Sequence, residues 1–280
     1  MTGVRACVLG ADGQLGRALT AAMPEALALG RDGLDIGDPV AVGGHDFTGV
    51  EVVFNAAAHT AVDRAETEPA AAWRVNALGP AHLAQAAHRY GFLLVHLSTE
   101  YVFDGTAPGP MPEHTPLSPL GVYGASKAAG ELAVRASGAE HLIVRTSWVV
   151  GDGANFVATM TRLAREGAAP AVVDDQIGRP TFAGDLAAAL VDLAGRQRGT
   201  VHVTNDGEPV SWHGLAREVF ARHGRDPDDV RPVSTADYAA GRQLARRPAN
   251  SVLDLSLLTR AGVTMPSWRD ALDAHQGGRS

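Results

Sequence analysis

The stretch VRACVLGADGQLG, residues 4–16, decides the fold of this chain. Its apolar run, Val4–Leu9, has the length of a buried strand, and a helical spacing of apolar residues follows over Leu15–Met23. Between them, Gly10, Gly13 and Gly16 are spaced G-x-x-G-x-x-G. Glycines between a first strand and a first helix permit a tight turn, let the backbone approach a pyrophosphate, and let the helix pack close to the sheet.

The helix that follows this turn begins with free N–H groups and the positive end of its dipole, which suits a phosphate. We therefore expect a dinucleotide to bind here. The expected cofactor-binding residues at this turn are Gly10, Gly13, Gln14, Leu15 and Gly16. A tight turn required only for packing is the alternative.

Short apolar runs continue to alternate with alanine-rich helical segments further along the chain. Strands are predicted at Glu51–Asn55, Phe92–Leu97 and His141–Arg145, and helices at Ala70–Tyr90 and Ser126–Arg135. This alternation predicts an α/β fold, a Rossmann-type doubly wound parallel sheet with a smaller C-terminal substrate-binding lobe. The expected dinucleotide-binding domain covers 1–150 plus roughly 170–204, and the lobe covers 151–169 and 205–280.

Composition narrows the class of protein. The net charge of −7 and pI near 5.8 argue against binding to nucleic acid or an anionic membrane. No secretory signal peptide and no apolar run of transmembrane length is seen, so we expect a cytoplasmic protein. Cys7 is the one cysteine and is expected to be a buried, inert thiol. The histidines lack zinc-site spacing, which predicts no metal. The sequence does not decide the oligomeric state, and a homodimer is possible.

The choice of cofactor depends on residues about twenty positions after Gly10. An acidic residue there usually binds the ribose hydroxyl of NAD, whereas a nearby arginine accommodates the 2′-phosphate of NADP. This chain has Arg31 followed by Asp32. Arg31 favours NADPH and Asp32 keeps NADH possible. The alternative is that Arg31 is an ordinary solvated loop charge.

Tyr123 and Lys127 form the second candidate site. Lys127 is the only lysine in the chain, whose 24 basic residues are otherwise arginines. A spacing of four places both side chains on one face of a helix. A nearby ammonium favours the phenolate and lowers the pKa of a tyrosine, and arginine does not substitute freely for this compact charge. The pattern predicts a catalytic pair, and a surface lysine on an alanine-rich helix is the alternative.

Several motifs in order along the chain make the sequence resemble one family. They are GADGQLG (10–16), NAAAHTAVDRAE (55–66), STEYVFDG (98–105), YGASK (123–127), RTSW (145–148), DDQIGRPT (174–181) and RPANS (247–251). Together they resemble the dTDP-4-dehydrorhamnose reductase family of the extended short-chain dehydrogenases/reductases, over nearly the whole chain. The resemblance implies NAD(P)H-dependent reduction of the C4 ketone of a dTDP-4-keto-6-deoxy sugar, in dTDP-L-rhamnose or related deoxysugar biosynthesis.

The resemblance also implies roles for single residues. Tyr123 would protonate the sugar C4 oxygen, Lys127 would lower its pKa and bind the nicotinamide ribose, and Thr99 would hydrogen-bond the carbonyl. Further cofactor-binding residues would be Asp35, Ile36, Ala56, Ala57 and Ala58. The substrate-binding residues would be Thr60, Val62, Thr99, Glu100, Tyr101 and Trp148, with plain core packing as the alternative for Trp148.

Two departures keep the identity of the sugar open. The family typically has Asp where this chain has Glu100, and its lobe is somewhat longer. A sugar-nucleotide dehydratase or epimerase of the same fold is the first alternative, but a dehydratase usually has two carboxylates after the threonine, and Glu100 is followed by Tyr101. The second is a non-catalytic subunit resembling the regulatory subunit of methionine adenosyltransferase, against which intact Thr99, Tyr123 and Lys127 argue.

Replacing the single lysine tests the pair. If Lys127 must fit beneath a ribose as a compact cation, Lys127→Arg is expected to lose activity nearly as completely as Lys127→Ala, by a factor of about 100 or more. The measurement is reductase kcat/KM at saturating NADPH for the native protein and both variants. A native-like arginine variant would show that only the positive charge matters.

Overall fold

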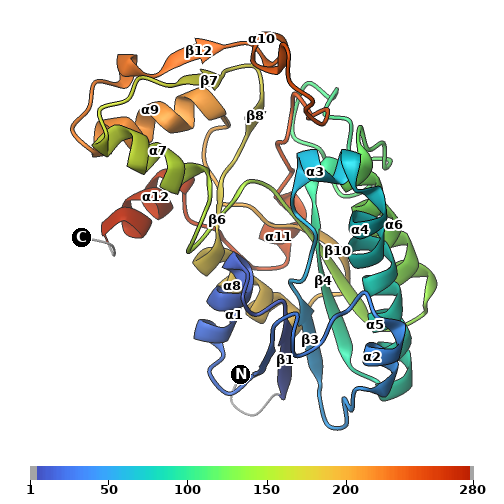
Figure 1. Cartoon of the computed structure of the whole chain (residues 1–280). Helices are drawn as coiled ribbons and strands as arrows, with labels where there is room; N and C mark the ends of the chain where they lie inside the picture. The colour runs from blue at the N-terminus through green and yellow to red at the C-terminus, as the bar shows by residue number, and fades with distance from the viewer. Residues whose placement is uncertain (1–4, 278–280) are drawn as a thin grey trace.

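The computed structural model describes residues 5–277, so Val4 and the outermost residues of the two expected domains lie outside the described part. The strands are β1 (Ala6–Leu9), β2 (Leu27–Leu29), β3 (Val52–Asn55), β4 (Leu93–Thr99), β5 (His141–Thr146), β6 (Val149–Val150), β7 (Ala171–Val173), β8 (Ile177–Gly178), β9 (Thr181–Phe182), β10 (Gly199–His202), β11 (Val210–Ser211) and β12 (Arg231–Val233). Figure 1 shows their arrangement.

The helices alternate with these strands along most of the chain. They are α1 (Gln14–Ala22), α2 (Pro39–Gly44), α3 (Val62–Thr67), α4 (Pro69–Trp73), α5 (Gly79–Tyr90), α6 (Val122–Ala136), α7 (Phe156–Arg165), α8 (Ala183–Ala194), α9 (Trp212–Arg222), α10 (Thr235–Ala239), α11 (Ser256–Arg260) and α12 (Trp268–Gly277). Three irregular helical segments are the π-helix η1 (Arg74–Leu78) and the 3₁₀ helices η2 (Glu100–Val102) and η3 (Pro227–Asp229). None of the helices in residues 5–277 combines the length and the apolar character needed to cross a membrane.

A six-stranded parallel sheet in the order β10-β5-β4-β3-β1-β2 forms the centre, which confirms the predicted fold class. The strands predicted from apolar runs correspond to β1, β3, β4 and β5. Strands β2 and β10 were not predicted, because β2 is short and largely exposed and β10 has only two buried residues. The strand order reverses beside β1, and ligands of such sheets bind at the carboxyl ends of the strands at this point.

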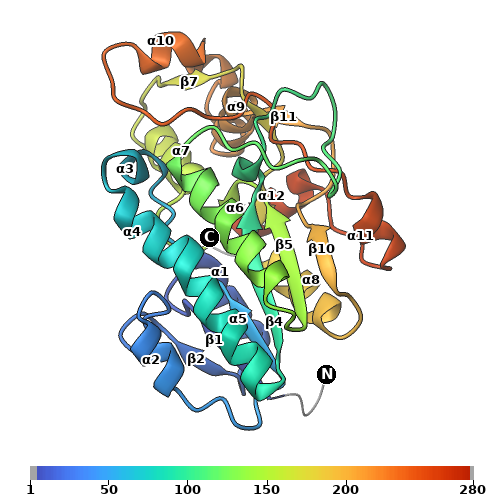
Figure 2. The same cartoon turned by 90° about the vertical axis from the view of Figure 1, so that its right-hand side faces the viewer.

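Side chains of the sheet pack alternately against its two faces. Ala6 and Val8 join the core formed with α1 and α8, while Cys7 and Leu9 join the core formed with α5 and η1. Figures 1 and 2 show helices on both faces. Cys7 is fully buried, as predicted, and burial raises the pKa of its thiol to about 12. A thiol this protonated is a poor nucleophile.

Helix α6 begins at Val122 and contains the predicted helical segment Ser126–Arg135. Gly124 lies in its first turn, although glycine has a low helical propensity. The structure explains this glycine, because a Cβ there would lie 2.2 Å from the carbonyl oxygen of Tyr101. Tyr123 therefore lies in the first turn of α6, on the same helix as Lys127. The helix predicted over Ala70–Tyr90 is also present, with the π-turn η1 in its middle.

The C-terminal lobe has its own apolar core. Helices α7, α9 and α12 pack around Trp268, Phe220 and Val172, next to the small pairs β7/β12 and β8/β11. The predicted domain boundaries stay a prediction, and two segments pack differently from their neighbours in sequence. Strand β7 lies in the range expected for the dinucleotide-binding domain but pairs with β12 of the lobe. Leu258 and Met265 lie in the range expected for the lobe but pack into the core of the central sheet.

The turn after β1 depends on two glycines. Gly10 has a φ of +74°, and a Cβ on it would lie 2.6 Å from the backbone nitrogen of Ala57. A Cβ on Gly16 would lie 2.1 Å from the carbonyl oxygen of Gly10. Both distances are too short for a side chain, so α1, the turn and the end of β3 are in backbone contact.

Gly16→Ala is expected to destabilise the protein by about 2–3 kcal/mol, because the methyl group forces α1 away from the turn. Gly184→Ala in α8 is the matched control, since no described atom lies within 4 Å of its added Cβ. The control is expected to be neutral or slightly stabilising. Urea unfolding of both variants measures the difference, and equal midpoints would contradict the packing argument.

Candidate active site

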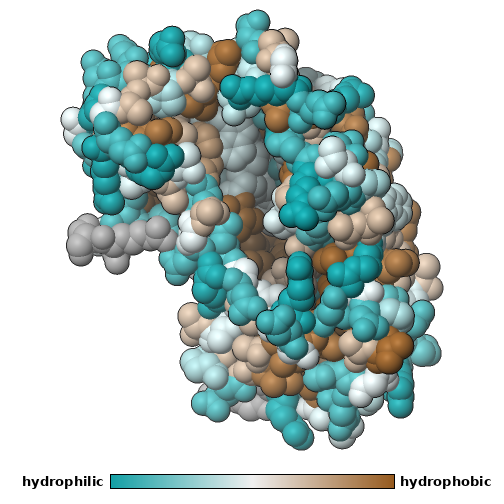
Figure 3. Space-filling view, viewed as in Figure 1, coloured by the Kyte–Doolittle hydropathy of each residue, from teal (hydrophilic) through white to brown (hydrophobic). Residues whose placement is uncertain are grey.

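Two adjoining cavities open at the carboxyl ends of the central strands. The larger one, about 470 Å³, is lined by Thr99, Tyr123 and Lys127, and we call it the Thr99 cavity. The smaller one, about 310 Å³, is lined by Arg31 and Asp35, and we call it the Asp35 cavity. Gly13, Ala56 and Ala58 line both of them, so the two cavities adjoin along the glycine turn. Figure 3 shows the hollow between the sheet domain and the lobe.

Most of the predicted cofactor residues line these cavities. Gly10 and Ala57 line the Asp35 cavity, and Gln14 and Leu15 line the Thr99 cavity. Helix α1 begins after Gly13, which lines both cavities, and its first N–H groups receive no side-chain cap from the described residues. Gly16 lines neither cavity within the described residues, and its role is the close packing given above.

Two arginines surround Asp35. Arg74 donates a hydrogen bond of 2.8 Å to Asp35, and the backbone N–H of Gly37 donates one of 2.9 Å. Burial alone would raise the pKa of Asp35, but these bonds and the charges of Arg74 and Arg31 outweigh it and lower the pKa. Arg31 lines the cavity, whereas exposed Asp32 is absent from its described lining. Arg74 was not predicted, because it lies on η1, far from the glycine turn in sequence.

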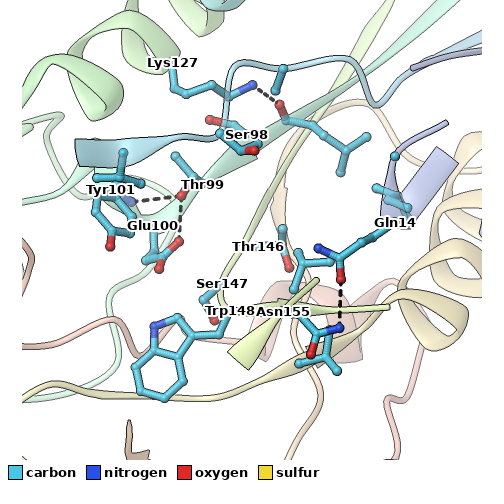
Figure 4. Close-up of a pocket in the computed structure, with 18 of the residues that line it drawn as sticks. Gln14, Ser98, Thr99, Glu100, Tyr101, Lys127, Thr146, Ser147, Trp148 and Asn155 are labelled. Carbon is cyan, nitrogen blue, oxygen red and sulfur yellow. Dashed lines mark hydrogen bonds between the residues drawn. The ribbon is translucent and has the colours of Figure 1, made fainter. Parts of the chain in front are cut away.

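Thr99, Tyr123 and Lys127 come together in the Thr99 cavity (Figure 4 labels Thr99 and Lys127). Thr99 ends β4, and α6 carries the other two. The Thr99 hydroxyl is hydrogen-bonded to the Tyr123 side chain and donates to Oε2 of Glu100 at 2.6 Å. The Tyr123 ring meets the Tyr101 ring edge-on, with centroids 5.4 Å apart.

Burial changes the ionisation of both α6 residues. It raises the pKa of Tyr123, and the charge of Glu100 raises it further, while the hydrogen bond with Thr99 lowers it. Burial lowers the pKa of Lys127 to about 8, and the Glu131 charge opposes this change. Nζ of Lys127 donates to the carbonyl oxygen of Leu97 at 2.5 Å. Burial and Glu100 dominate the pKa of Tyr123, and the expectation that Lys127 lowers it stays a prediction.

Glu100 is a buried carboxylate at the wall of this cavity. It is 2% exposed, and burial raises its pKa to about 7, although hydrogen bonds with Thr99 and Ser251 oppose this rise. Its Oε1 atom has no hydrogen-bond partner among residues 5–277. A buried carboxylate oxygen without a partner is costly, so this atom is suited to a hydroxyl of a bound molecule.

Trp148 lines the Thr99 cavity in an unusual backbone conformation. Its φ of +47° is rare for a bulky residue, and its ring stacks on Trp212 with centroids 3.6 Å apart. Gly178, in the DDQIGRPT motif, accommodates this ring, because a Cβ there would lie 2.7 Å from it. Trp212 in turn packs against Phe156, and both also line the cavity. Neither was predicted, since each lies outside the motifs.

The remaining predicted substrate residues, Thr60, Val62 and Tyr101, also line the Thr99 cavity. The loop before Thr60 is held by Asn76 of the π-helix η1. The Asn76 side chain accepts a hydrogen bond from the His59 N–H at 2.8 Å and donates one to the His59 carbonyl at 3.0 Å. Short π-helical segments inside α-helices are frequent at functional sites. Across residues 5–277, no cluster of three or more His, Cys, Asp or Glu could hold a metal ion.

Comparison with known proteins identifies the family. The model of the RmlD substrate binding domain matches residues 4–276. The chain belongs to the RmlD substrate-binding domain family. It is 45% identical to a dTDP-4-dehydrorhamnose reductase of Mycobacterium tuberculosis, covering 96% of this chain and 91% of that protein. The corresponding protein of Streptomyces griseus is also 45% identical, covering 95% and 90%.

A solved RmlD-type structure has the same fold. The dTDP-4-dehydrorhamnose reductase of Bacillus anthracis, in complex with NADP, superposes with a TM-score of 0.91 and 36% identity, covering 97% of this chain and 98% of that one. The predicted resemblance is therefore confirmed over both the sheet domain and the lobe. The roles of single residues in this member of the RmlD family stay predictions.

The buried Glu100 is expected to make stability depend on pH. Its pKa is raised on folding, so its stabilising contribution is complete below about pH 4.5 and is lost as the pH rises to about 7. Between pH 5 and 8 the native protein is expected to lose about 2–3 kcal/mol of unfolding free energy that Glu100→Gln does not lose. Urea unfolding at both pH values measures this, with exposed Glu166→Gln as the control. Parallel pH dependence in all three proteins would contradict the prediction.

Proposed function

We propose that the protein reduces the C4 ketone of a dTDP-4-keto-6-deoxy sugar with NADPH, in dTDP-L-rhamnose or related deoxysugar biosynthesis. One observation carries the proposal. Thr99, Tyr123 and Lys127 line one cavity, and this cavity is continuous with the glycine turn at the start of α1. A dinucleotide lying along the turn would bring its nicotinamide end to Tyr123. The names of the relatives supply the sugar class.

The residues present fit an NADP cofactor. Gly10 and Gly13 place side-chain-free backbone at the cavity walls, and the uncapped start of α1 suits the pyrophosphate. Arg31 and Arg74 would face the 2′-phosphate at the Asp35 cavity, and the Bacillus anthracis relative was solved with NADP. When bound, NADPH supplies the hydride for the carbonyl carbon.

Tyr123 would supply the proton to the carbonyl oxygen. Its raised pKa keeps the phenol protonated at neutral pH, as a general acid requires. Thr99 lies beside this phenol and would orient the carbonyl through its hydroxyl, which Glu100 holds in the structure. Lys127 would bind the nicotinamide ribose from beneath, as a buried ammonium attached to the carbonyl oxygen of Leu97.

The rest of the cavity would select the sugar. Oε1 of Glu100 would accept a hydroxyl, and Trp148 with Trp212 would form an apolar wall. Glu100 is longer than the typical Asp by one methylene, which moves the carboxylate by about 1 Å and alters hydroxyl contacts. The cytoplasmic location and the homodimer stay predictions of the sequence.

A dehydratase or epimerase of the same fold would recycle its cofactor, whereas a reductase consumes NADPH in proportion to product. Tyr101 follows Glu100, so the described structure places no second carboxylate after Thr99. The test is NADPH oxidation against a panel of dTDP-4-keto-6-deoxy sugars. Stoichiometric oxidation with one or more of them supports the proposal, and turnover without net oxidation would replace it with the dehydratase or epimerase reading.

Tyr123→Phe is expected to lower kcat by a factor of about 100–10,000, because it removes only the phenolic hydroxyl that would donate the proton. The ring and its edge-on contact with Tyr101 remain, so folding and NADPH binding are expected to survive. Steady-state rates and NADPH titration of the same preparation measure both properties. Activity within a few-fold of native would exclude Tyr123 as the proton donor.

A further inference from the structure

Glu131 is a fully buried carboxylate outside the cavity, and it joins three elements. It lies on α6 and is 0% exposed. The Ser98 hydroxyl on β4 donates to its Oε1 at 2.5 Å. Arg145 on β5 donates to both oxygens, from Nε at 2.9 Å and from Nη2 at 2.7 Å. Arg135, one turn further along α6, adds a bond of 2.8 Å.

These bonds are made next to the residues proposed for catalysis. Lys127, one turn before Glu131 on α6, donates to the carbonyl oxygen of Leu97. Lys127 and Glu131 therefore attach α6 to two successive residues of β4, Leu97 and Ser98. The next residue of β4 is Thr99. The helix that carries the acid is thus fixed to the strand that carries the threonine.

Arg145 extends the same attachment to the neighbouring strand. In the parallel register, Arg145 is the partner of Ser98, and Thr146 is the partner of Thr99. Arg145 is 1% exposed and also donates to the Glu113 carbonyl at 2.9 Å. Trp148 follows three residues after Arg145. The Glu131 carboxylate is therefore bonded to the strand that ends in Thr99 and to the strand that leads to Trp148, and both of these residues line the Thr99 cavity.

We propose that Glu131 is a positioning residue for the reduction: its carboxylate fixes Thr99, Tyr123 and Lys127 relative to one another. The proposal rests on the proposed reductase function. A buried ion pair that served stability alone would also be bonded to Arg145. The bonds to the residue preceding Thr99 and the one-turn spacing from Lys127 are what point to the site.

The charge on Lys127 gives this role its own readout. The groups that face this region are His96 on β4, Arg145 on β5, Glu100 at η2, and Tyr123, Glu131 and Arg135 on α6. His96 is buried, and burial holds its pKa well below the usual value, so it stays neutral. Glu131 is the charge that raises the pKa of Lys127 against the effect of burial. Without it, Arg145 and Arg135 would remain as unneutralised cations.

The experiment compares Glu131→Gln, Glu131→Asp and the exposed control Glu140→Gln, which loses only a surface ion pair with Arg198. Each is measured for kcat, KM, the pH dependence of kcat/KM, and the pH dependence of NADPH affinity without substrate. Glu131→Gln is expected to lower kcat by about 10–100-fold and to move the alkaline limb of both profiles down by about one pH unit. Glu131→Asp is expected to restore the native position of the alkaline limb but not the native kcat. The negative charge returns, but the shorter side chain does not reach the hydrogen-bond partners of Glu131.

Arg135→Gln covers the case in which Glu131→Gln does not fold, since the Arg135 side chain is partly exposed. Removing this cation is expected to move the alkaline limb upward. The proposal would be overturned if folded Glu131→Gln kept the native kcat and the native position of the alkaline limb. It would also be overturned if the alkaline limb of Arg135→Gln did not move. A fall in kcat with unmoved pH profiles would also overturn it, as a purely structural effect. Native protein that binds NADPH but reduces no sugar would instead refute the proposed function.

Discussion

Backbone-to-backbone contact at the glycine turn is the constraint on which the site depends. Gly16 lies against the carbonyl of Gly10, and Gly10 lies against Ala57, at distances that exclude a Cβ. This contact fixes where α1 starts relative to the ends of β1 and β3. The junction of the two cavities is built from the same residues, since Gly13, Ala56 and Ala58 line both. A wider turn would separate the cofactor region from Thr99.

Burial of the side chains of Tyr123, Lys127 and Glu100 determines their ionisation in the Thr99 cavity. Burial pushes Tyr123, Lys127 and Glu100 toward their neutral forms, and each is opposed by a neighbour. For the phenol and the carboxyl, the neutral form is the one that can donate a proton or a hydrogen bond. The role proposed for Lys127 requires the charged form, and the nearby Glu131 acts in that direction. Burial thus sets the direction of each pKa change, and a hydrogen bond with Thr99 or the charge of Glu131 opposes it.

Much of this organisation could be predicted because it is local in sequence. The glycine turn, the apolar strands and the Tyr123–Lys127 spacing each lie within a few residues, where spacing fixes geometry. Arg74, Trp212 and Glu131 could not be placed in the same way, since their partners lie far away along the chain. The contact of Glu131 with Ser98 depends on how α6 packs on the sheet. The spacing of Tyr123 and Lys127 predicts that they are close to one another, but it does not predict how deeply they are buried, and burial dominates the pKa of Tyr123.

Trp212 belongs to two surfaces at once. It starts α9 in the core of the lobe, and it also forms part of the Thr99 cavity, where it stacks on Trp148. Any change in how α9 packs therefore moves a wall of the cavity while Thr99, Tyr123 and Lys127 stay on the sheet domain. A substitution deep in the lobe can therefore change the shape of the cavity without altering the residues proposed to react.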